Sequence, residues 1–262
     1  MAIEVFNRQE CKFLIHKSIY KDIENRILRY MELDDYNKEK EFYTISNIYY
    51  DTEDNHLIRT SLCKPTYKEK LRLRAYGIPK GEDKVFLEVK KKVNGFGNKR
   101  RTKLELQEAY EFFSTGKKPE IKNYMNKQVI NEVEYIFKTY HLKPKLYIAY
   151  DRRAFFYKEN RNLRITFDEN IRTRRYDLAL EKGDYGENLL QEDEILMEIK
   201  TDYSIPLWLC KLLSEYKIFK RSFSKYGNEY EKMLLSNTQL KGEMKPCLNQ
   251  YLTQPQLIHQ FL

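Results

Sequence analysis

The chain has 262 residues, and its 48 Lys and Arg against 39 Asp and Glu give it a formal net charge of +9. Hydrophobic residues make up 41% of it, with 22 Tyr and 14 Phe, which is enough apolar surface for a sizeable core and excludes wholesale disorder. With only 9 Gly and 7 Pro, the composition is not collagen-like. No apolar run approaches the roughly 18 residues of a membrane span.

The beginning of the chain carries Glu4, Arg8 and Glu10, which interrupt the apolar stretch that a signal peptide requires. The four cysteines are scattered and form no CxxC pair, so free thiols are predicted rather than a disulfide framework or a zinc site. These features predict a cytoplasmic protein without a transmembrane segment.

Alternation of polar and apolar residues with period two predicts β-strands along much of the chain. The segments with this pattern are 6–15, 42–51, 67–77, 84–92, 97–106, 144–157, 162–170 and 194–202. The segment 42–51 is more apolar and is rich in aromatic and β-branched residues, which favour strands.

Helical spacing appears between these strands. Ser18 is placed to cap a helix that runs towards Met31. Further helices are predicted at 104–113, at about 124–140 and, after Pro206, at 207–219.

Many strands with helices between them, without strict βαβ alternation, predict an α+β fold with a mainly antiparallel sheet. Residues 1–235 are predicted to form one domain. Residues 236–262 are polar and Gln-rich, and we predict that they form a loosely attached tail or a docking segment.

The polar faces of the predicted strands carry far more cations than carboxylates. Together they contain Arg8, Glu10, Lys12, Lys70, Arg72, Arg74, Glu88, Lys90, Lys99, Arg101, Arg152, Arg164 and Glu198. If these faces turn outward, they form a basic surface in contact with solvent, and nucleic-acid binding is a further possibility. If they turn inward, the strands must close into a barrel with a charged interior.

An inward arrangement would need a polyanion inside it. Two like charges 4 Å apart repel by about 4 kcal/mol at an effective dielectric of 20, so an empty interior with so many cations would be strained. A phosphate chain fits, because guanidinium groups bind phosphate oxygens in pairs and lysines add mobile charge. Carboxylates on the same face would repel phosphate directly, but they can hold a divalent cation that bridges to it.

Eight motifs occur in an order that resembles one protein family. They are RxExK at 8–12, LRLRAYG at 71–77, VFLEVKKK at 85–92, KRR at 99–101, YDRRAFF at 150–156, LRITFDENI at 163–171, LMEIK at 196–200 and FSKYG at 223–227. Over about residues 4–232 the chain resembles the VTC (vacuolar transporter chaperone) domain, the polyphosphate-polymerase branch of the triphosphate tunnel metalloenzymes.

The resemblance implies an antiparallel β-barrel tunnel with helices packed outside it. It also implies transfer of the γ-phosphoryl group of ATP to a growing inorganic polyphosphate chain, with release of ADP and dependence on Mn²⁺ or Mg²⁺. ATP and polyphosphate are then the expected partners, nucleic acid is not expected, and the identity of any protein partner stays open.

The resemblance further assigns roles to individual residues. The catalytic, phosphate-gripping residues would be Arg72, Arg74, Lys90, Arg152 and Arg164. Additional substrate-binding residues would be Arg8, Lys12, Lys70, Lys99, Arg101 and Lys225. Glu198 would be the principal metal ligand, and Glu10 and Glu88 would be secondary ligands or would position lysines. Asp168 would be a supporting group or a turn residue.

One position departs from the hydrolase relatives of this superfamily, which begin with ExExK where this chain has Arg8. Exchanging a carboxylate for a cation there favours holding a long phosphate product over hydrolysing a short substrate. Two alternatives stay open beside the polymerase. One is metal-dependent hydrolysis of triphosphate or short polyphosphate in the same tunnel, and the other is a non-catalytic module that binds polyanions.

Overall fold

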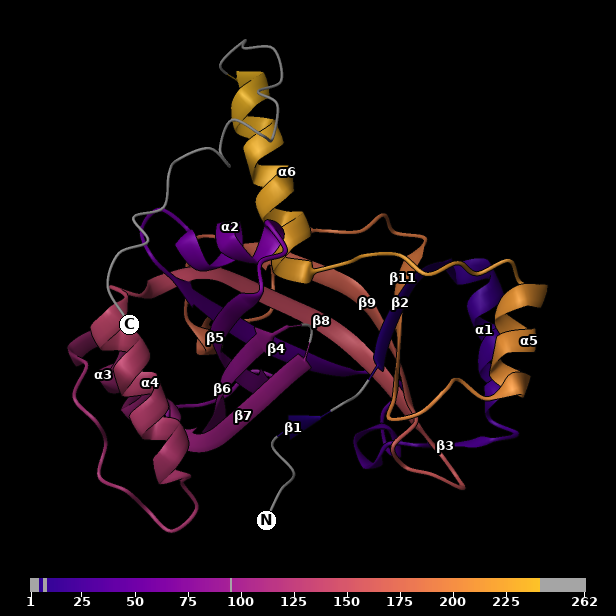
Figure 1. The fold of residues 1–262 in the computed structure, drawn as a ribbon, viewed down its shortest axis with the longest axis horizontal. Coiled ribbons are helices and arrows are strands. Elements are labelled where there is room, and N and C mark those ends of the chain that lie inside the picture. The colour runs from indigo at the N-terminus through magenta and orange to yellow at the C-terminus, as the bar shows by residue number, and fades with distance from the viewer. Residues whose placement is uncertain (1–4, 7–8, 95, 241–262) are drawn as a thin grey trace.

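The computed structural model describes residues 5–6, 9–94 and 96–240, which form a mixed α+β fold (Figure 1). The helices in this part of the chain are α1 (Lys17–Ile27), α2 (His56–Leu62), α3 (Leu106–Thr115), α4 (Lys127–Thr139), α5 (Leu207–Glu215) and α6 (Lys225–Leu240), with short 3-10 helices η1 (Asp35–Asn37) and η2 (Leu180–Lys182). The strands are β1 (Val5–Phe6), β2 (Gln9–His16), β3 (Met31–Leu33), β4 (Tyr43–Asp51), β5 (Tyr67–Tyr76), β6 (Lys84–Val93), β7 (Phe96–Glu105), β8 (Lys143–Tyr157), β9 (Arg164–Arg174), β10 (Glu187–Asn188) and β11 (Glu194–Thr201).

These strands form one sheet in which every pairing is antiparallel, as the sequence predicts. The strand order is β1-β7-β6-β5-β4-β8-β9-β11-β2, with β3 paired to β8 and β10 paired to β9. The register shifts once in β4–β8 and once in β8–β9, so β8 bends as it crosses the middle of the sheet.

The two edges of the sheet approach each other, although no strand pairing joins them within the described residues. Phe6 of β1 and Gln9 of β2 are three residues apart in the chain, so their Cα atoms lie at most about 11 Å apart. An ion pair between Lys90 of β6 and Glu10 of β2 (3.6 Å) also joins the two sides. The sheet is therefore strongly curved, but the expected closed barrel is not confirmed.

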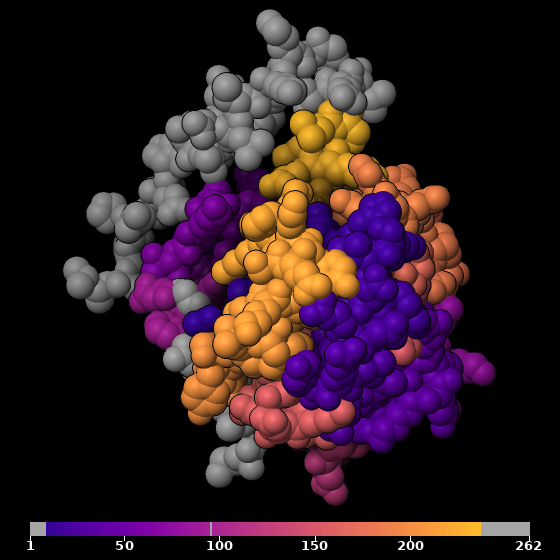
Figure 2. All heavy atoms as spheres, turned by 90° about the vertical axis from the view of Figure 1, so that its right-hand side faces the viewer, coloured from indigo at the N-terminus to yellow at the C-terminus, as the bar shows by residue number. Residues whose placement is uncertain are grey.

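The helices α1, α3, α4 and α5 lie on the outer side of this curve and cover apolar faces of its strands. Leu73 of β5 packs in a core with Val133 of α4, while Ile165 of β9 packs with Ile23 of α1 and Leu212 of α5. Figure 2 shows α1 (indigo) and α5 (yellow-orange) packed side by side over their part of the sheet. Burying one such aliphatic side chain stabilises the fold by about 1.5–3 kcal/mol, so the strand faces beneath these four outer helices are apolar and the charged positions turn inward. The helices α2 and α6 instead pack on the inner side, where Ile58 and Tyr226 join a core with Tyr49.

All four predicted helices are present, with shifted ends. His16 rather than Ser18 is the N-cap of α1, because the His16 ring accepts a hydrogen bond from the Ser18 backbone N–H. β7 continues through Glu105, so α3 begins two residues later than predicted, and it ends at Gly116 with φ +71°. α5 ends at Glu215, before the predicted end at residue 219.

The sequence analysis did not predict α2 or α6. α6 continues to Leu240 and therefore crosses the predicted domain boundary at residue 235, so the division into domain and tail stays a prediction. Residues 241–262 lie outside the described residues. Among the described residues, no helix combines the length and the apolar character needed to cross a membrane.

Candidate functional site

The concave side of the sheet, here called the inner face, gathers the charged residues from the polar faces of the strands. Strand register places Lys12 opposite Glu198, and Arg72 opposite Glu88. The inner face is defined by Glu10, Lys12, Lys70, Arg72, Arg74, Glu88, Lys90, Lys99, Arg101, Arg152, Arg164, Asp168, Glu198 and Lys200, with Lys225 reaching it from α6. It includes all the predicted site residues except Arg8, which lies outside the described residues. Their roles stay predictions.

Glu88 is the centre of the first group of contacts on the inner face. Its side chain is 1% exposed and accepts hydrogen bonds from Nε and Nη2 of Arg72 (2.8 and 2.6 Å), while Lys99 lies 2.7 Å away. Burial raises the pKa of Glu88, but Arg72, Arg74 and Lys99 outweigh it and hold this pKa well below its usual value. Glu88 therefore serves these cations as a counter-ion.

Asp168 is the centre of the second group and is completely buried. It receives two hydrogen bonds from Arg152 (2.6 and 2.8 Å) and one from Lys225 (2.5 Å). Burial raises the pKa of Asp168, but these two cations outweigh it and lower the pKa to about 2. Asp168 is thus a member of the site and no turn residue, since it lies within β9.

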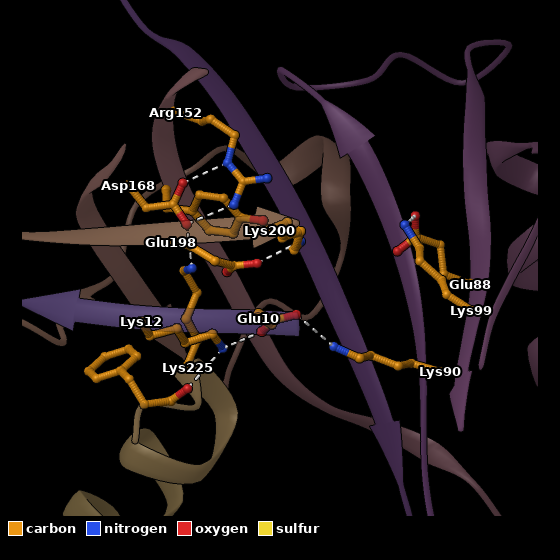
Figure 3. A network of polar contacts seen from close by, with 12 residues as sticks. Glu10, Lys12, Glu88, Lys90, Lys99, Arg152, Asp168, Glu198, Lys200 and Lys225 are labelled. Atoms are coloured by element: carbon orange, nitrogen blue, oxygen red, sulfur yellow. Dashed lines mark hydrogen bonds and ion pairs between the residues drawn. The ribbon is translucent and has the colours of Figure 1, made fainter. Parts of the chain in front are cut away.

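The third group contains Glu10 and Glu198, which project from the neighbouring strands β2 and β11 (Figure 3). Glu10 lies 3.1 Å from Lys12 and 3.6 Å from Lys90, and Glu198 lies 2.6 Å from Lys200. Burial and Glu198 raise the pKa of Glu10, but the lysines outweigh them and lower it to about 2. In the β2–β11 ladder Glu10 lies opposite Lys200, so Glu10 and Glu198 are diagonal neighbours on the same face of two paired strands. Figure 3 places Glu88 apart from both.

Tyrosine and asparagine side chains also hold the arginines in place. Arg72 donates from Nη1 to the Tyr49 hydroxyl (2.8 Å). Arg74 donates to Asn47 Oδ1 (2.9 Å) and to the Tyr150 hydroxyl (3.0 Å). The sequence analysis did not identify these three residues as part of the site, because they lie in strands whose composition is mainly apolar. Their only signal is that their positions share a face with the charged residues.

Two predicted residues lie at the end of the inner face that faces η1. Arg164 donates to Asp34 Oδ2 (2.8 Å), and its guanidinium group lies 4.9 Å from the centre of the Phe156 ring. Arg101 lies over the Phe86 ring at 4.8 Å. Arg72 and Arg152 likewise lie over the rings of Tyr49 and Tyr150, so aromatic rings border the arginines along the whole inner face.

The carboxylates of the inner face do not neutralise its cations. Glu10, Glu88 and Asp168 each contact two or more basic groups, and Glu198 pairs with Lys200. Lys70 contacts no carboxylate among the described residues, only the Ser224 hydroxyl (3.3 Å). Because like charges in a partly buried setting repel by several kcal/mol, this surplus creates a strong attraction for an anion with several charges.

These features define an α+β protein whose charged residues gather on the concave side of one curved antiparallel sheet. The chain belongs to the VTC domain family, because the sequence model of the VTC domain matches residues 7–234. The family resemblance noted in the sequence is thereby confirmed. A comparison with curated proteins gave no match.

Similar folds occur among solved structures. A putative adenylate cyclase from Bacillus halodurans matches with a TM-score of 0.52 and 14% identity, over 85% of this chain and 96% of that one. A putative adenylyl cyclase from Hippeastrum, described as having a dominant triphosphatase activity, matches with a TM-score of 0.47 and 16% identity, over 90% and 97%. A protein from Pyrococcus horikoshii matches with a TM-score of 0.41 and 16% identity, over 86% and 99%. The first likeness shows a shared fold, and the two lower scores carry no conclusion.

Proposed function

We propose that this protein is an ATP-dependent polyphosphate polymerase, which transfers the γ-phosphoryl group of ATP to a growing inorganic polyphosphate chain and releases ADP. Membership of the VTC domain family supports the proposal. The observation that carries it is the surplus of cations on the inner face over its four carboxylates, each of which is already paired with at least one basic group. A chain of phosphates would supply the missing negative charge along the whole face.

In the proposed reaction, a terminal oxygen of the polyphosphate attacks the γ-phosphorus of ATP. The new P–O bond forms as the bond to the β-phosphate oxygen breaks, and ADP leaves with the electron pair. Such transfers need little covalent chemistry from the protein, because positioning and charge stabilisation supply most of the rate.

Hydrogen bonds hold the arginines of the inner face in fixed orientations, which suits them to position phosphates. Arg72 is fixed by Glu88, and Arg152 is fixed by Asp168, each through two hydrogen bonds. Arg74 is held through hydrogen bonds by the neutral side chains of Asn47 and Tyr150, and it lies farther from the Glu88 carboxylate (3.9 Å) than Arg72 does, so more of its charge is available to a phosphate oxygen. We assign the gripping of the reacting phosphates to these residues together with Lys90 and Arg164. We assign the binding of the rest of the chain to Lys12, Lys70, Lys99, Arg101 and Lys225, and to Arg8.

The residues present fit a divalent cation at Glu10 and Glu198. Apart from its ion pair with Lys200, the buried Oε1 atom of Glu198 has no hydrogen-bond partner. Mg²⁺ is commonly bound by one or two carboxylates together with substrate phosphates, and these two carboxylates would hold Mg²⁺ or Mn²⁺ in that way. The cation would neutralise charge that develops on the transferred phosphoryl group. Glu88 is taken up by arginine and lysine, and the described residues contain no cluster of three or more metal-binding side chains.

The test is to incubate purified protein with ATP and Mn²⁺ or Mg²⁺ and to resolve the phosphate products by chain length on a gel. Long phosphate chains together with ADP are the expected result. Free phosphate as the only phosphate product would overturn the polymerase in favour of a triphosphatase. Salt-sensitive binding of polyphosphate without nucleotide turnover would indicate a non-catalytic module.

Lys90 and Lys91 form a matched pair that tests the role of the inner face. Lys90 points towards Glu10 on this face, whereas Lys91 lies on the opposite face, 2.7 Å from Glu132. Lys90→Met should weaken the affinity for polyphosphate about tenfold or more, because a hydrogen bond to a charged group contributes about 1.5–3 kcal/mol. Lys91→Met should leave this affinity unchanged in the same calorimetric titration. Equal losses in the two variants would contradict the assignment.

The affinity for polyphosphate should fall as the pH rises from 7 to 9. Burial and the neighbouring Lys90 lower the pKa of Lys70 to about 8. Burial raises the pKa of Tyr150, but Arg74 and Arg152 outweigh it and lower this pKa to about 8. Above that pH, Lys70 loses a positive charge and Tyr150 gains a negative one, and both changes weaken the attraction for phosphate.

Titrations at constant ionic strength with long-chain polyphosphate, whose internal phosphates keep one charge each over this range, check the expectation. Lys70→Met should remove part of the pH dependence. An affinity that stays constant or rises with pH in the unmodified protein would contradict it.

A further inference from the structure

Four aromatic rings form a continuous cluster at one end of the inner face. Tyr36 of η1 stacks on Tyr76 of β5, with ring centres 4.9 Å apart and planes 6° apart. Tyr76 in turn meets the Phe86 ring edge-on at 5.6 Å, and Tyr43 lies 5.3 Å from Tyr36. We call these four residues the aromatic end.

The aromatic end continues the row of arginines on the inner face. Phe86 lies opposite Arg74 in the β5–β6 ladder, and Tyr43 lies opposite Arg152 in the β4–β8 ladder. Along β5 the inner-face order is Lys70, Arg72, Arg74 and Tyr76. At about 3.4 Å per residue, Arg74 and Arg72 therefore lie roughly 7 and 14 Å from Tyr76, and Lys70 lies roughly 20 Å from it.

Part of the aromatic end is open to solvent. The Tyr36 side chain is 54% exposed, and Ile78, which follows Tyr76 in the chain, is 51% exposed. A flat apolar group that covered the exposed part of the Tyr36 ring would gain free energy, because apolar surface would be removed from water.

The segment that carries Tyr36 is firmly anchored. Asn37 Nδ2 donates to the backbone oxygen of Glu41 (3.0 Å), and Asn37 Oδ1 accepts from the backbone N–H of Ala154 (2.9 Å). Asp34, which precedes η1, accepts from Arg164 (2.8 Å). The Tyr36 ring is thus held at a set position beside the inner face.

We infer that the aromatic end is a stacking platform for the nucleobase of a nucleoside triphosphate. The inference rests on the proposed function, and it adds the orientation in which the nucleotide lies along the inner face. The base covers the exposed face of Tyr36, and the phosphates follow the inner face towards Arg74 and Arg72. Every base has a π-face that can stack on an aromatic side chain, and the flanking Arg101 adds a cation beside the rings. The polyphosphate chain then lies on the far side, towards Lys70 and Lys225.

The test compares two ligands in calorimetric titrations with EDTA present, which prevents turnover. ATP carries a base, and inorganic tripolyphosphate has three phosphates without one. Tyr36→Ala should weaken the binding of ATP about tenfold, within the range expected from base–aromatic stacking, and should leave tripolyphosphate binding unchanged. Tyr36→Phe keeps the ring and should bind ATP as the unmodified protein does. Tyr135→Ala removes a tyrosine that is 69% exposed on α4, and it serves as the matched control with no expected effect.

The outcomes separate this inference from the proposed function. If Tyr36→Ala binds both ligands as the unmodified protein does, or weakens both equally, the platform is overturned while the polymerase assay stands by itself. Phe86→Leu provides a second variant in case Tyr36→Ala disturbs η1, and it should show the same selective loss. If the unmodified protein binds neither ligand, both proposals are wrong. If ATP binding shows the selective loss but no chains are made from ATP, the platform stands and the polymerase does not.

Discussion

The Glu198→Gln variant should release ADP from ATP and Mn²⁺ at least about 100 times more slowly than the unmodified protein, because removing one group that stabilises transition-state charge commonly costs this much. Glu198 is 6% exposed on β11, next to Lys200, and its carboxylate would hold the divalent cation together with Glu10. The affinity for polyphosphate without metal should stay the same or rise, because the substitution removes a negative charge from the face that binds phosphate.

Glu194→Gln is the matched control for this variant. Glu194 stands on the same strand but at its beginning, where its carboxylate accepts a hydrogen bond from the Gln191 backbone N–H (3.3 Å). The Glu194→Gln variant should release ADP at the rate of the unmodified protein. Binding of Mn²⁺ alone, followed by electron paramagnetic resonance, should weaken only in Glu198→Gln. Near-normal ADP release by Glu198→Gln would remove this residue from the metal-binding role, and a parallel loss of polyphosphate affinity would point to a structural role instead.

The Asp168→Asn variant should lose about 3–5 kcal/mol of unfolding free energy at pH 7, because breaking a buried ion pair leaves charge without compensation. Here two cations would lose their partner, since Arg152 and Lys225 both bind the Asp168 carboxylate. Inorganic tripolyphosphate should restore part of the loss, since its oxygens can take the place of the missing carboxylate. Urea titrations with and without this ligand measure both effects.

Asp151→Asn is the control for burial. Asp151 also pairs with an arginine, Arg172 (2.8 Å), but its side chain is 18% exposed, so water can replace part of the lost interaction and the cost should be clearly smaller. An equal loss of unfolding free energy in the two variants would contradict a larger stabilising role for Asp168.

The stability that Asp168 provides should depend on pH. Its pKa is lowered to about 2 in the folded protein, so its contribution to the unfolding free energy is complete above the unfolded pKa of about 3.9 and is lost as the pH falls towards 2.

The assignment of residues to one or the other face of the sheet could be predicted from the period of two within each strand. This rule separates Lys90, on the inner face, from its neighbour Lys91 on the outer face. It also separates Arg152 from Arg153, which pairs with Glu24 of α1 on the outside. The rule is local, because successive side chains of a strand alternate whatever the rest of the chain does.

The ion pairs of the site were much harder to predict. Asp168 lies an even number of residues from Arg164 in β9, and Lys200 lies two residues from Glu198 in β11. The alternation of side chains would therefore have placed both residues on the charged face. Nothing in the sequence indicated that Asp168 binds Lys225, because the two residues are 57 positions apart and helix α6 was not predicted. The stacking of Tyr36 on Tyr76 likewise depends on where η1 is anchored.

The sequence by itself determined the long strands, most of the helices and the composition of the charged face, but not the short strands β3 and β10. It left open whether this face turns to solvent or to the interior, and whether the sheet closes. Only the tertiary structure decided the first point: helices such as α4 cover the apolar face through contacts like that of Leu73 with Val133, so the charged face is the one left on the concave side. Closure depends on twist accumulated over the whole sheet, which no single strand encodes, and the described strands curve until β1 and β2 approach without pairing.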